Sequence, residues 1–175
     1  MPMEAQSATV DNTVQGDELR QLVVFRLGVE GFGVNINKVR EINRLVEITR
    51  IPESPEFIEG VINLRGEIIP IIDMRKRFGM TIEQDTNQSN RIMVIETENQ
   101  LIGFIVDEVQ EVLRIPAGKI DPPPELISTE VDRRYIEGVA ALEERLLIVL
   151  DSDRIFAANE LKSLQKIETE VEAEV

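Results

Sequence analysis

Residues 22–42 read LVVFRLGVEGFGVNINKVREI, and residues 92–112, which align with them without a gap, read IMVIETENQLIGFIVDEVQEV. A second pair of stretches, 58–78 and 136–156, opens with the same four residues, Ile-Glu-Gly-Val. The first pair is offset by 70 residues and the second by 78, so the second copy contains eight additional residues. A solenoid needs several short repeats, whereas a long repeat that occurs only twice predicts two similar small lobes.

The amino-acid composition leaves few ways to build a catalytic site. The chain has 175 residues, of which 42% are hydrophobic, and this is sufficient for a buried core. It contains no cysteine and no histidine, which excludes disulfides, thiolate nucleophiles, histidine-dependent catalysis and most zinc sites. We therefore expect no enzymatic activity and no cofactor or metal.

The charge of the chain argues against two classes of partner. The formal net charge is −14, whereas nucleic acids and anionic membranes are bound by basic surfaces. No run of eighteen apolar residues occurs, and the N-terminus lacks a basic region followed by an apolar one. We expect a cytoplasmic protein that neither binds nucleic acid nor inserts into a membrane.

Short apolar runs rich in β-branched residues predict a mainly β fold. Such runs are typical of strands that are buried on both faces, and they occur at 22–25, 68–72, 92–95, 101–106 and 146–150. Many short strands in two copies predict two small barrels packed together, because closure removes unpaired strand edges. A few short helices are expected, with one longer C-terminal helix within 153–164.

The order of the segments predicts one domain between two polar ends. Residues 1–18 are expected to be a disordered leader and residues 163–175 an acidic tail. The domain, 19–162, would consist of two lobes, roughly 19–90 and 91–162 by sequence, which could also be intertwined. The additional residues of the second copy include Pro122-Pro123-Pro124, which would either span between the lobes or form a surface loop.

The stretch 63–66, Asn-Leu-Arg-Gly, lies between two predicted strands and should form the tip of a hairpin. Asn at the first position and Gly at the fourth favour a type I turn with Leu64 and Arg65 in its centre. The second copy has Glu143 where the first has Arg65, so turn chemistry alone does not explain the arginine. Arg65 is therefore a candidate anchor for a protein partner, and the alternative is an ion pair with Glu67 or another neighbour.

Pro70 falls inside the apolar run 68–72, where the second copy has Ile148. Because proline has no N–H to donate, this strand is expected to be an edge strand or to contain a bulge. Such an edge would serve either as a docking face or as protection against aggregation.

Asp73 and Asp151 occupy equivalent positions in the two copies and raise an enzymatic alternative. Two related β lobes that each supply one aspartate are the outline of a pepsin-like protease, in which paired carboxylates share a proton. That mechanism needs an Asp-Thr-Gly or Asp-Ser-Gly turn, and neither aspartate here is followed by glycine. Each could instead cap a helix that begins after it, and an aspartic-protease-like hydrolase stays open as the alternative.

Residues 39–42, Val-Arg-Glu-Ile, and 109–112, Val-Gln-Glu-Val, form another shared pattern. Two apolar residues three apart can cover one side of a short turn or strand while the glutamate stays in water. Glu41 is the better candidate for a contact, since Arg40 and Arg44 give it a charged margin that the second copy lacks in that form.

Much of the chain, from about residue 19 to residue 160, resembles the CheW-type chemotaxis coupling proteins. The resemblance rests on residues 32–42, 58–75, 105–113, 122–124 and 135–140. It implies two five-stranded SH3-like barrels that share a hydrophobic interface, and an adaptor rather than an enzyme. Members of this family join the cytoplasmic tips of chemoreceptors to the regulatory domain of a histidine kinase.

The resemblance also implies roles for individual residues. The positions that match kinase contacts or their supports are Val39, Glu41, Ile42 and Gly60. The positions that match receptor or array contacts are Asn63, Arg65, Val109 and Val112. The pathway could be flagellar chemotaxis, pilus-driven motility or another receptor-kinase system, and a domain with a single partner is a further alternative. The isolated chain is expected to be a monomer.

Overall fold

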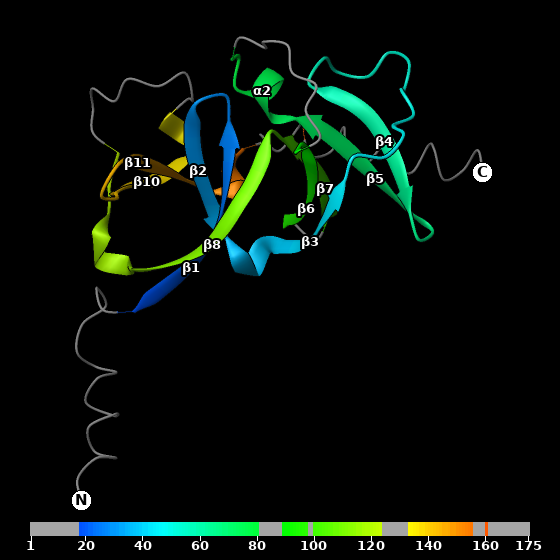
Figure 1. The fold of residues 1–175 in the computed structure, drawn as a ribbon. Helices are drawn as coiled ribbons and strands as arrows, with labels where there is room; N and C mark the ends of the chain where they lie inside the picture. Colours follow the sequence, from blue (N-terminus) through cyan, green and yellow to red (C-terminus); the bar gives the residue numbers. More distant parts are fainter. Residues whose placement is uncertain (1–17, 81–88, 98–99, 124–132, 156–159, 161–175) are drawn as a thin grey trace, which may run out of the picture.

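The structure is a computed structural model, and it describes residues 18–80, 89–97, 100–123, 133–155 and 160 (Figure 1). In chain order, with η for 3-10 helices, its elements are β1 Leu19–Leu27, β2 Glu30–Asn35, η2 Ile36–Lys38, β3 Val39–Arg44, β4 Ile58–Leu64, β5 Glu67–Asp73, α2 Met74–Arg77, β6 Arg91–Thr97, β7 Gln100–Val106, β8 Glu108–Pro116, η3 Ala117–Lys119, β9 Ile120–Asp121, η4 Arg133–Tyr135, β10 Ile136–Ala141, β11 Leu146–Leu150 and η5 Ser152–Arg154.

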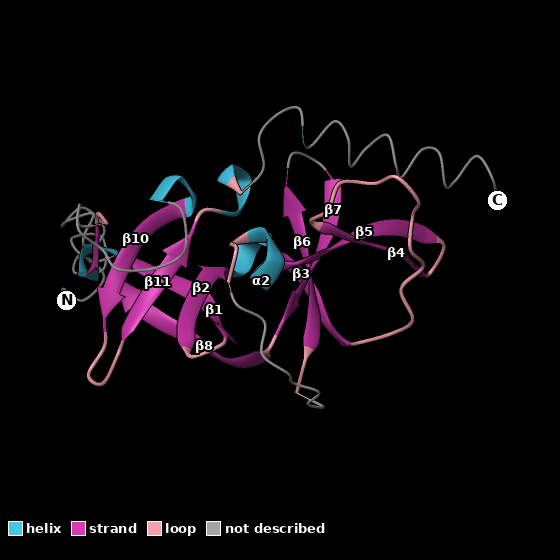
Figure 2. Ribbon diagram, turned by 90° about the horizontal axis from the view of Figure 1, so that it is seen from above, coloured by secondary structure: helices cyan, strands magenta, loops and turns pink. Residues whose placement is uncertain are grey.

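Two β-sheets build the described part of the chain, and Figure 2 shows them side by side. Sheet A has the strand order β8-β1-β2-β11-β10-β9, and sheet B has the order β3-β6-β7-β5-β4. The predicted mainly β fold with two related lobes is therefore confirmed. Sheet A exceeds the expected five strands by the two-residue strand β9. At the matching place in sheet B, a single bridge joins Thr49 to Val61.

Each sheet combines strands from both sequence copies. β1 and β2 come from the first copy but lie in sheet A with β8 to β11, and β6 and β7 come from the second copy but lie in sheet B with β3 to β5. The two strand orders match position by position, with β8 in the place of β3, β1 of β6, β2 of β7, β11 of β5 and β10 of β4. The lobes are thus intertwined, and a boundary near residue 90 does not separate them.

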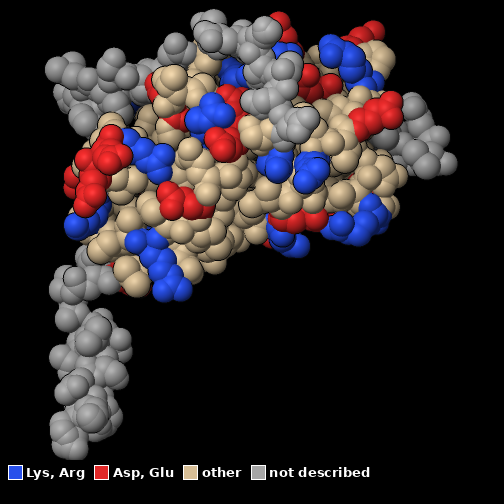
Figure 3. Space-filling model, viewed as in Figure 1, with Lys and Arg blue, Asp and Glu red and all other residues tan. Residues whose placement is uncertain are grey.

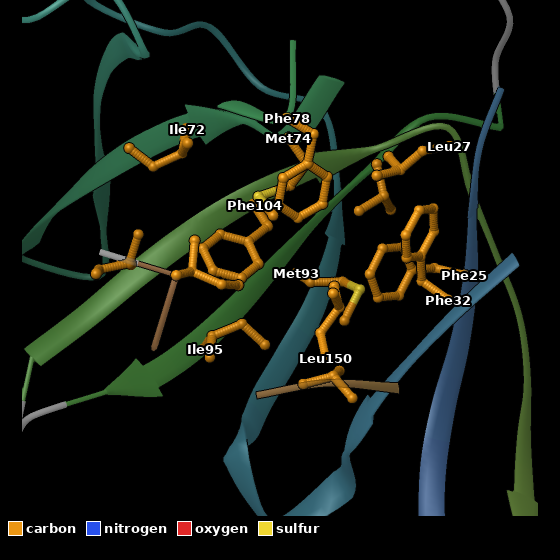
Figure 4. Packing of buried hydrophobic residues seen from close by; sticks show 14 of the residues in the cluster. Phe25, Leu27, Phe32, Ile72, Met74, Phe78, Met93, Ile95, Phe104 and Leu150 are labelled. Atoms are coloured by element: carbon orange, nitrogen blue, oxygen red, sulfur yellow. The ribbon is translucent and has the colours of Figure 1, made fainter. Parts of the chain in front are cut away.

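The inner strands of each sheet are buried on both faces. One face lines the interior of the lobe that the sheet forms, lobe A for sheet A and lobe B for sheet B, and the other face packs toward the second lobe. Neighbouring residues of a strand point to opposite faces. On β1, Leu22 and Val24 belong to a cluster inside lobe A, whereas Phe25 belongs to the cluster shared by both lobes (Figure 4). There the rings of Phe25 and Phe32 stack with centroids 5.7 Å apart. This double burial explains why the strands read as continuous apolar runs instead of alternating ones.

The prediction that Pro70 marks an edge strand or a bulge is wrong, since the bulge of this ladder lies in β4 between Ile58 and Gly60 and not at Pro70. β5 is an inner strand, with β4 on one side and β7 on the other. Opposite Pro70 lies Val61, whose backbone N–H and C=O both bond to Thr49 at 2.9 Å. Val61 and Pro70 are therefore a pair without mutual hydrogen bonds. The ladder between β5 and β7 begins at Ile71, so the missing N–H of Pro70 interrupts neither neighbour.

Several predictions concern residues that the structure does not describe. The leader falls almost entirely on residues 1–17, the acidic tail on 163–175, and most of the expected C-terminal helix on 156–159 and 161–164. Of the triple proline, only Pro122 and Pro123 are described. None of the described helices has the length and apolar character needed to cross a bilayer.

Candidate protein-interaction site

The tip of the β4–β5 hairpin differs from the predicted type I turn. Leu64 pairs with Glu67, so the two central residues are Arg65 and Gly66, with φ of 52° and 89°. Two positive φ values are the pattern of a type I′ turn, whose twist fits the two strands that it joins. The N–H of Gly66 donates to Oδ1 of Asn63 at 2.9 Å. The turn thus holds an arginine in the left-handed region, which disfavours residues other than glycine.

The guanidinium of Arg65 forms an ion pair with the carboxylate of Glu41 on β3. β3 and β4 are the two edge strands of sheet B, so this pair links the hairpin at one edge to the strand at the other. The side chain of Arg65 is nevertheless 71% exposed. The two interpretations of Arg65, an ion pair with a neighbour and an anchor for a partner, are therefore compatible. The guanidinium is held in place by Glu41 and is still accessible.

Lobe A contains the corresponding ion pair, built from a different position of its turn. Nη2 of Arg145 lies 3.3 Å from Oε2 of Glu111 on edge strand β8, and Nη1 donates to the side chain of Gln110 at 3.2 Å. Glu111 is the equivalent of Glu41, but Arg145 aligns with Glu67 and not with Arg65. Aligning the copies residue by residue therefore missed Arg145, although the basic residue in its turn was visible in the sequence.

Exposed apolar residues follow the glutamate of each ion pair in the sequence, on the same edge strand or just after it. In lobe B they are Ile42, which is 39% exposed, with Leu45 and Val46 just after β3, and we call these residues with Glu41 and Arg65 rim B. In lobe A the residue after the glutamate is Val112, which is 52% exposed, and the exposed Leu146 follows Arg145. We call these two with Glu111 and Arg145 rim A. Ile42 and Val112 are equivalent residues of the two copies. Exposed apolar groups beside charged ones on firm strands are typical of protein-binding surfaces.

The remaining predicted site residues lie nearer the interior. Val39 and Val109 are equivalent to each other, and both pack against the hydrophobic cluster between the lobes. Gly60 is buried at a bulge in β4, with φ of 150° and the backbone oxygen of Thr49 only 2.2 Å from where a Cβ would lie. Gly60 therefore positions the segment around Thr49, and a partner cannot reach it without a rearrangement.

The two aspartates of the protease alternative act as helix caps. Oδ1 of Asp73 accepts a hydrogen bond from the N–H of Arg75 at 2.9 Å, and Oδ1 of Asp151 accepts one from the N–H of Asp153 at 3.1 Å. This is the role that their positions before a helix predicted. Within the described residues, no group of carboxylates is arranged to hold a metal ion.

Charged residues of both signs alternate over the surface shown in Figure 3, and no continuous basic area appears on that face. A surface of this kind suits protein partners better than nucleic acid. The site therefore consists of two matching rims, one on each lobe.

The comparisons with known proteins agree with one another. A family model described as a CheW-like domain matches residues 21–160. The chain is similar to a probable chemotaxis protein CheW of Rhizobium etli, with 36% identity over 88% of this chain and 97% of that protein. It is also similar to the chemotaxis protein CheW of Klebsiella aerogenes, with 35% identity over 91% and 95%.

A solved structure shares the fold as well. The crystal structure of the scaffolding protein TtCheW from Thermoanaerobacter tengcongensis superimposes with a TM-score of 0.74 and 41% identity. The match covers 82% of this chain and 96% of that one.

Proposed function

The chain belongs to the CheW-like family of chemotaxis adaptors, and we propose that it holds a chemoreceptor tip and the regulatory domain of a histidine kinase at the same time. In this role it transfers signals through contacts and alters no covalent bond in either partner. Adaptors of this kind work in the cytoplasm, next to the tips of the receptors.

The observation that supports two-sided binding is the duplication of the rim. Rim A and rim B lie on different lobes, and each combines exposed apolar side chains with an ion pair. Two partners can therefore bind without competing for the same residues. Ion pairs that fix the edge strands also lower the conformational entropy that binding must remove.

We assign the kinase to rim B. Ile42 and Glu41 would make the contacts, while Val39 and Gly60 keep β3 and β4 in position from the interior. Arg65, together with Asn63 in the same turn, would contact the next component of the signalling array. Its guanidinium is exposed and held by Glu41, and arginine is frequent among the residues that dominate binding energy.

We assign the receptor to the β8 side of lobe A. Val109 lies at the margin of the cluster between the lobes, and Val112, three residues further, is exposed on the same strand. An apolar strip of this kind, beside the seam between the lobes, suits the apolar face of a receptor helix.

The test is a set of calorimetric titrations of the full chain with a receptor-tip helical hairpin and an isolated kinase regulatory domain, separately and together. Ile42→Lys should weaken kinase binding roughly thirtyfold, or about 2 kcal/mol, and Val112→Lys should do the same for the receptor. Val29→Lys is the matched control, because Val29 is 97% exposed outside both rims. The control should leave both affinities unchanged.

Three results would contradict the proposal. Unchanged affinity for both partners in Ile42→Lys and Val112→Lys would remove the rims from the binding surface. Competition between the two partners for the wild-type chain would show that they share one surface, and binding of one partner alone would favour a single-partner domain.

A further inference from the structure

The chain crosses from one sheet to the other at two places, and both are short. Residues 36–38, which form η2, connect β2 in sheet A to β3 in sheet B, and Asp107 alone connects β7 in sheet B to β8 in sheet A. These crossings create the exchange of strands between the copies. Because the two copies have equivalent strands, something must decide which copy completes which sheet.

The first crossing is held by an ion pair between the copies. β11 runs parallel to β2, so η5, which follows β11, lies near the residues that follow β2. Nζ of Lys38 lies 3.1 Å from Oδ2 of Asp153. Asp153 also accepts a hydrogen bond from the hydroxyl of Thr97, on β6 of the other sheet, at 2.9 Å.

The second crossing has the same arrangement with the charges reversed. β5 runs parallel to β7, and Nη1 of Arg75, in the helix after β5, lies 3.3 Å from Oδ1 of Asp107. Oδ2 of Asp107 accepts from the N–H of Gly28 in lobe A at 2.7 Å. By the alignment of the copies, Arg75 corresponds to Asp153, and Lys38 corresponds to Glu108 next to Asp107.

The edge strands show the same reversal. On β1, Nε of Arg26 lies 3.2 Å from Oε1 of Glu108 at the start of β8. On β6, the equivalent of Arg26 is Glu96, and it pairs at 2.9 Å with Arg40 on β3. In both lobes, therefore, the basic residue comes from the first copy and the acidic residue from the second.

Seven ion pairs between described residues of the two copies share this polarity. They are Arg20–Glu137, Arg26–Asp107, Arg26–Glu108, Lys38–Asp153, Arg40–Glu96, Arg75–Asp107 and Arg77–Glu160. The totals agree, because residues 19–80 contain ten basic and eight acidic side chains, a net charge of +2, whereas residues 91–160 contain seven and fifteen, a net charge of −8.

We propose that this charge difference specifies which copy completes each sheet, and so disfavours dimers in which strands of like copies from two molecules pair. If β5 lay beside β2, Arg75 would face Lys38, and if β11 lay beside β7, Asp153 would face Asp107 and Glu108. Like charges at these places disfavour the pairing of like copies, whereas the native pairing brings opposite charges together.

Complete pairing of like copies would require a second molecule. To lie beside β6 in its own lobe, β8 would have to pass β7, a distance of two strand spacings or about 10 Å. The single residue between Val106 and Glu108 spans at most about 7 Å. Like copies can therefore not pair in both lobes of one molecule, and complete pairing of like copies requires an exchanged dimer, as when a short connection cannot fold back.

The test exchanges the charges of two native ion pairs and keeps both attractions, and the only described contact it removes is the hydrogen bond from Thr97 to Asp153. The variant Lys38→Asp/Asp153→Lys/Arg40→Glu/Glu96→Arg keeps both native pairs but makes the pairing of like copies attractive as well. Wild type and variant are unfolded in guanidinium and refolded at increasing protein concentrations. The dimer fraction is then measured by size-exclusion chromatography with light scattering, before and after dilution. We expect about tenfold more dimer from the variant, which persists on dilution because exchanged strands separate only by unfolding.

The matched control is Glu111→Arg/Arg145→Glu, which exchanges the charges of an exposed ion pair within one copy. It should refold as wild type does. If the four substitutions together prevent folding, the double variant Lys38→Asp/Asp153→Lys provides the test instead. We expect it to give a smaller rise in the dimer fraction. A dimer fraction equal to that of wild type, an equal rise in the control, or a dimer that dissociates on dilution would each overturn the proposal.

Discussion

The two hairpin tips, Asn63–Gly66 in lobe B and Leu142–Arg145 in lobe A, perform the same task by different routes. Each directs an arginine to the glutamate on the edge strand of its lobe. In lobe B the arginine is a central residue of the turn and has a positive φ. In lobe A the arginine is the last residue of the turn, and the central residues Glu143 and Glu144 have negative φ. The two lobes thus place a guanidinium at equivalent points in space, although the two arginines occupy different positions of their turns.

The largest effect should come from the glycines beneath the two tips. Gly60→Ala places a Cβ 2.2 Å from the backbone oxygen of Thr49 at a φ of 150°, whereas Gly138→Ala places one 2.6 Å from the oxygen of Asp121 without that φ. We expect Gly60→Ala to lower the free energy of unfolding by about 3 kcal/mol or more and Gly138→Ala by about 2 kcal/mol. Urea denaturation measures both. A smaller loss for Gly60 would show that the segment around Thr49 moves aside easily.

The next effect concerns the two crossings, whose ion pairs differ in burial. The side chains of Arg75 and Asp107 are 13% and 8% exposed, whereas those of Lys38 and Asp153 are 38% and 40% exposed. Oδ1 of Asp107 has no hydrogen bond, so it depends on the charge of Arg75. Arg75→Met should therefore cost about 3 kcal/mol and Lys38→Met less than about 1 kcal/mol.

Urea denaturation at pH 7 provides this comparison, with Arg75→Met/Asp107→Asn as the matched control, because Asn removes the charge and still accepts from the N–H of Gly28. Removing both charges should recover much of the stability lost in Arg75→Met, since the unpaired carboxylate is then absent. If the double variant is as unstable as the single one, the loss comes from packing and not from charge.

A smaller effect should distinguish the backbone conformations of the two hairpin tips. Arg65→Gly removes a residue from the left-handed region, which relieves roughly 1 kcal/mol of strain and offsets the lost ion pair. Its melting temperature should therefore equal or exceed that of wild type. Glu143→Gly, at the equivalent position without positive φ, should instead lose about 0.5 kcal/mol through the greater freedom of the unfolded chain. Equal destabilisation of the two variants in calorimetry would contradict the difference in turn type.

The smallest effect is the coupling energy of the two ion pairs at the rims. Glu41 is more buried than Glu111, 28% against 48% exposed, whereas Arg65 is more exposed than Arg145, 71% against 37%, so solvent screens both pairs. Double-mutant cycles to alanine should give about 0.2–1 kcal/mol for each pair. Measuring both cycles in 1 M salt should reduce both couplings, and a coupling that resists salt would indicate contacts other than charge.

The sequence was sufficient for the fold class, because the repeat and the continuous apolar runs are local properties of the chain. The exchange of strands was out of reach, since either pairing of equivalent strands satisfies the same apolar pattern. Only the distribution of charge between the copies contains that information, and it becomes interpretable once the pairs are seen in space. Pro70 was misplaced for a related reason, because the direction of its missing N–H depends on register.

The surface positions of several candidate residues could be predicted, whereas their binding roles stay predictions. Glu41, Ile42, Arg65 and Val112 lie at a turn or on an edge strand with exposed or partly exposed side chains, and charged and apolar residues of such segments are visible in the sequence. Arg145 was missed because the alignment of the two copies compares sequence positions. It does not show that side chains from different positions can reach equivalent places in the structure. The turn type was also missed, because Arg65 adopts a φ that few residues other than glycine occupy.

Because strands are exchanged between the sequence copies, neither half of the polypeptide can form a complete lobe. A chain divided between α2 and β6 would yield two fragments, each lacking part of both sheets. Such fragments can bury their apolar strands only by combining, so the adaptor offers a natural place to build a split reporter that regains its shape when its halves meet.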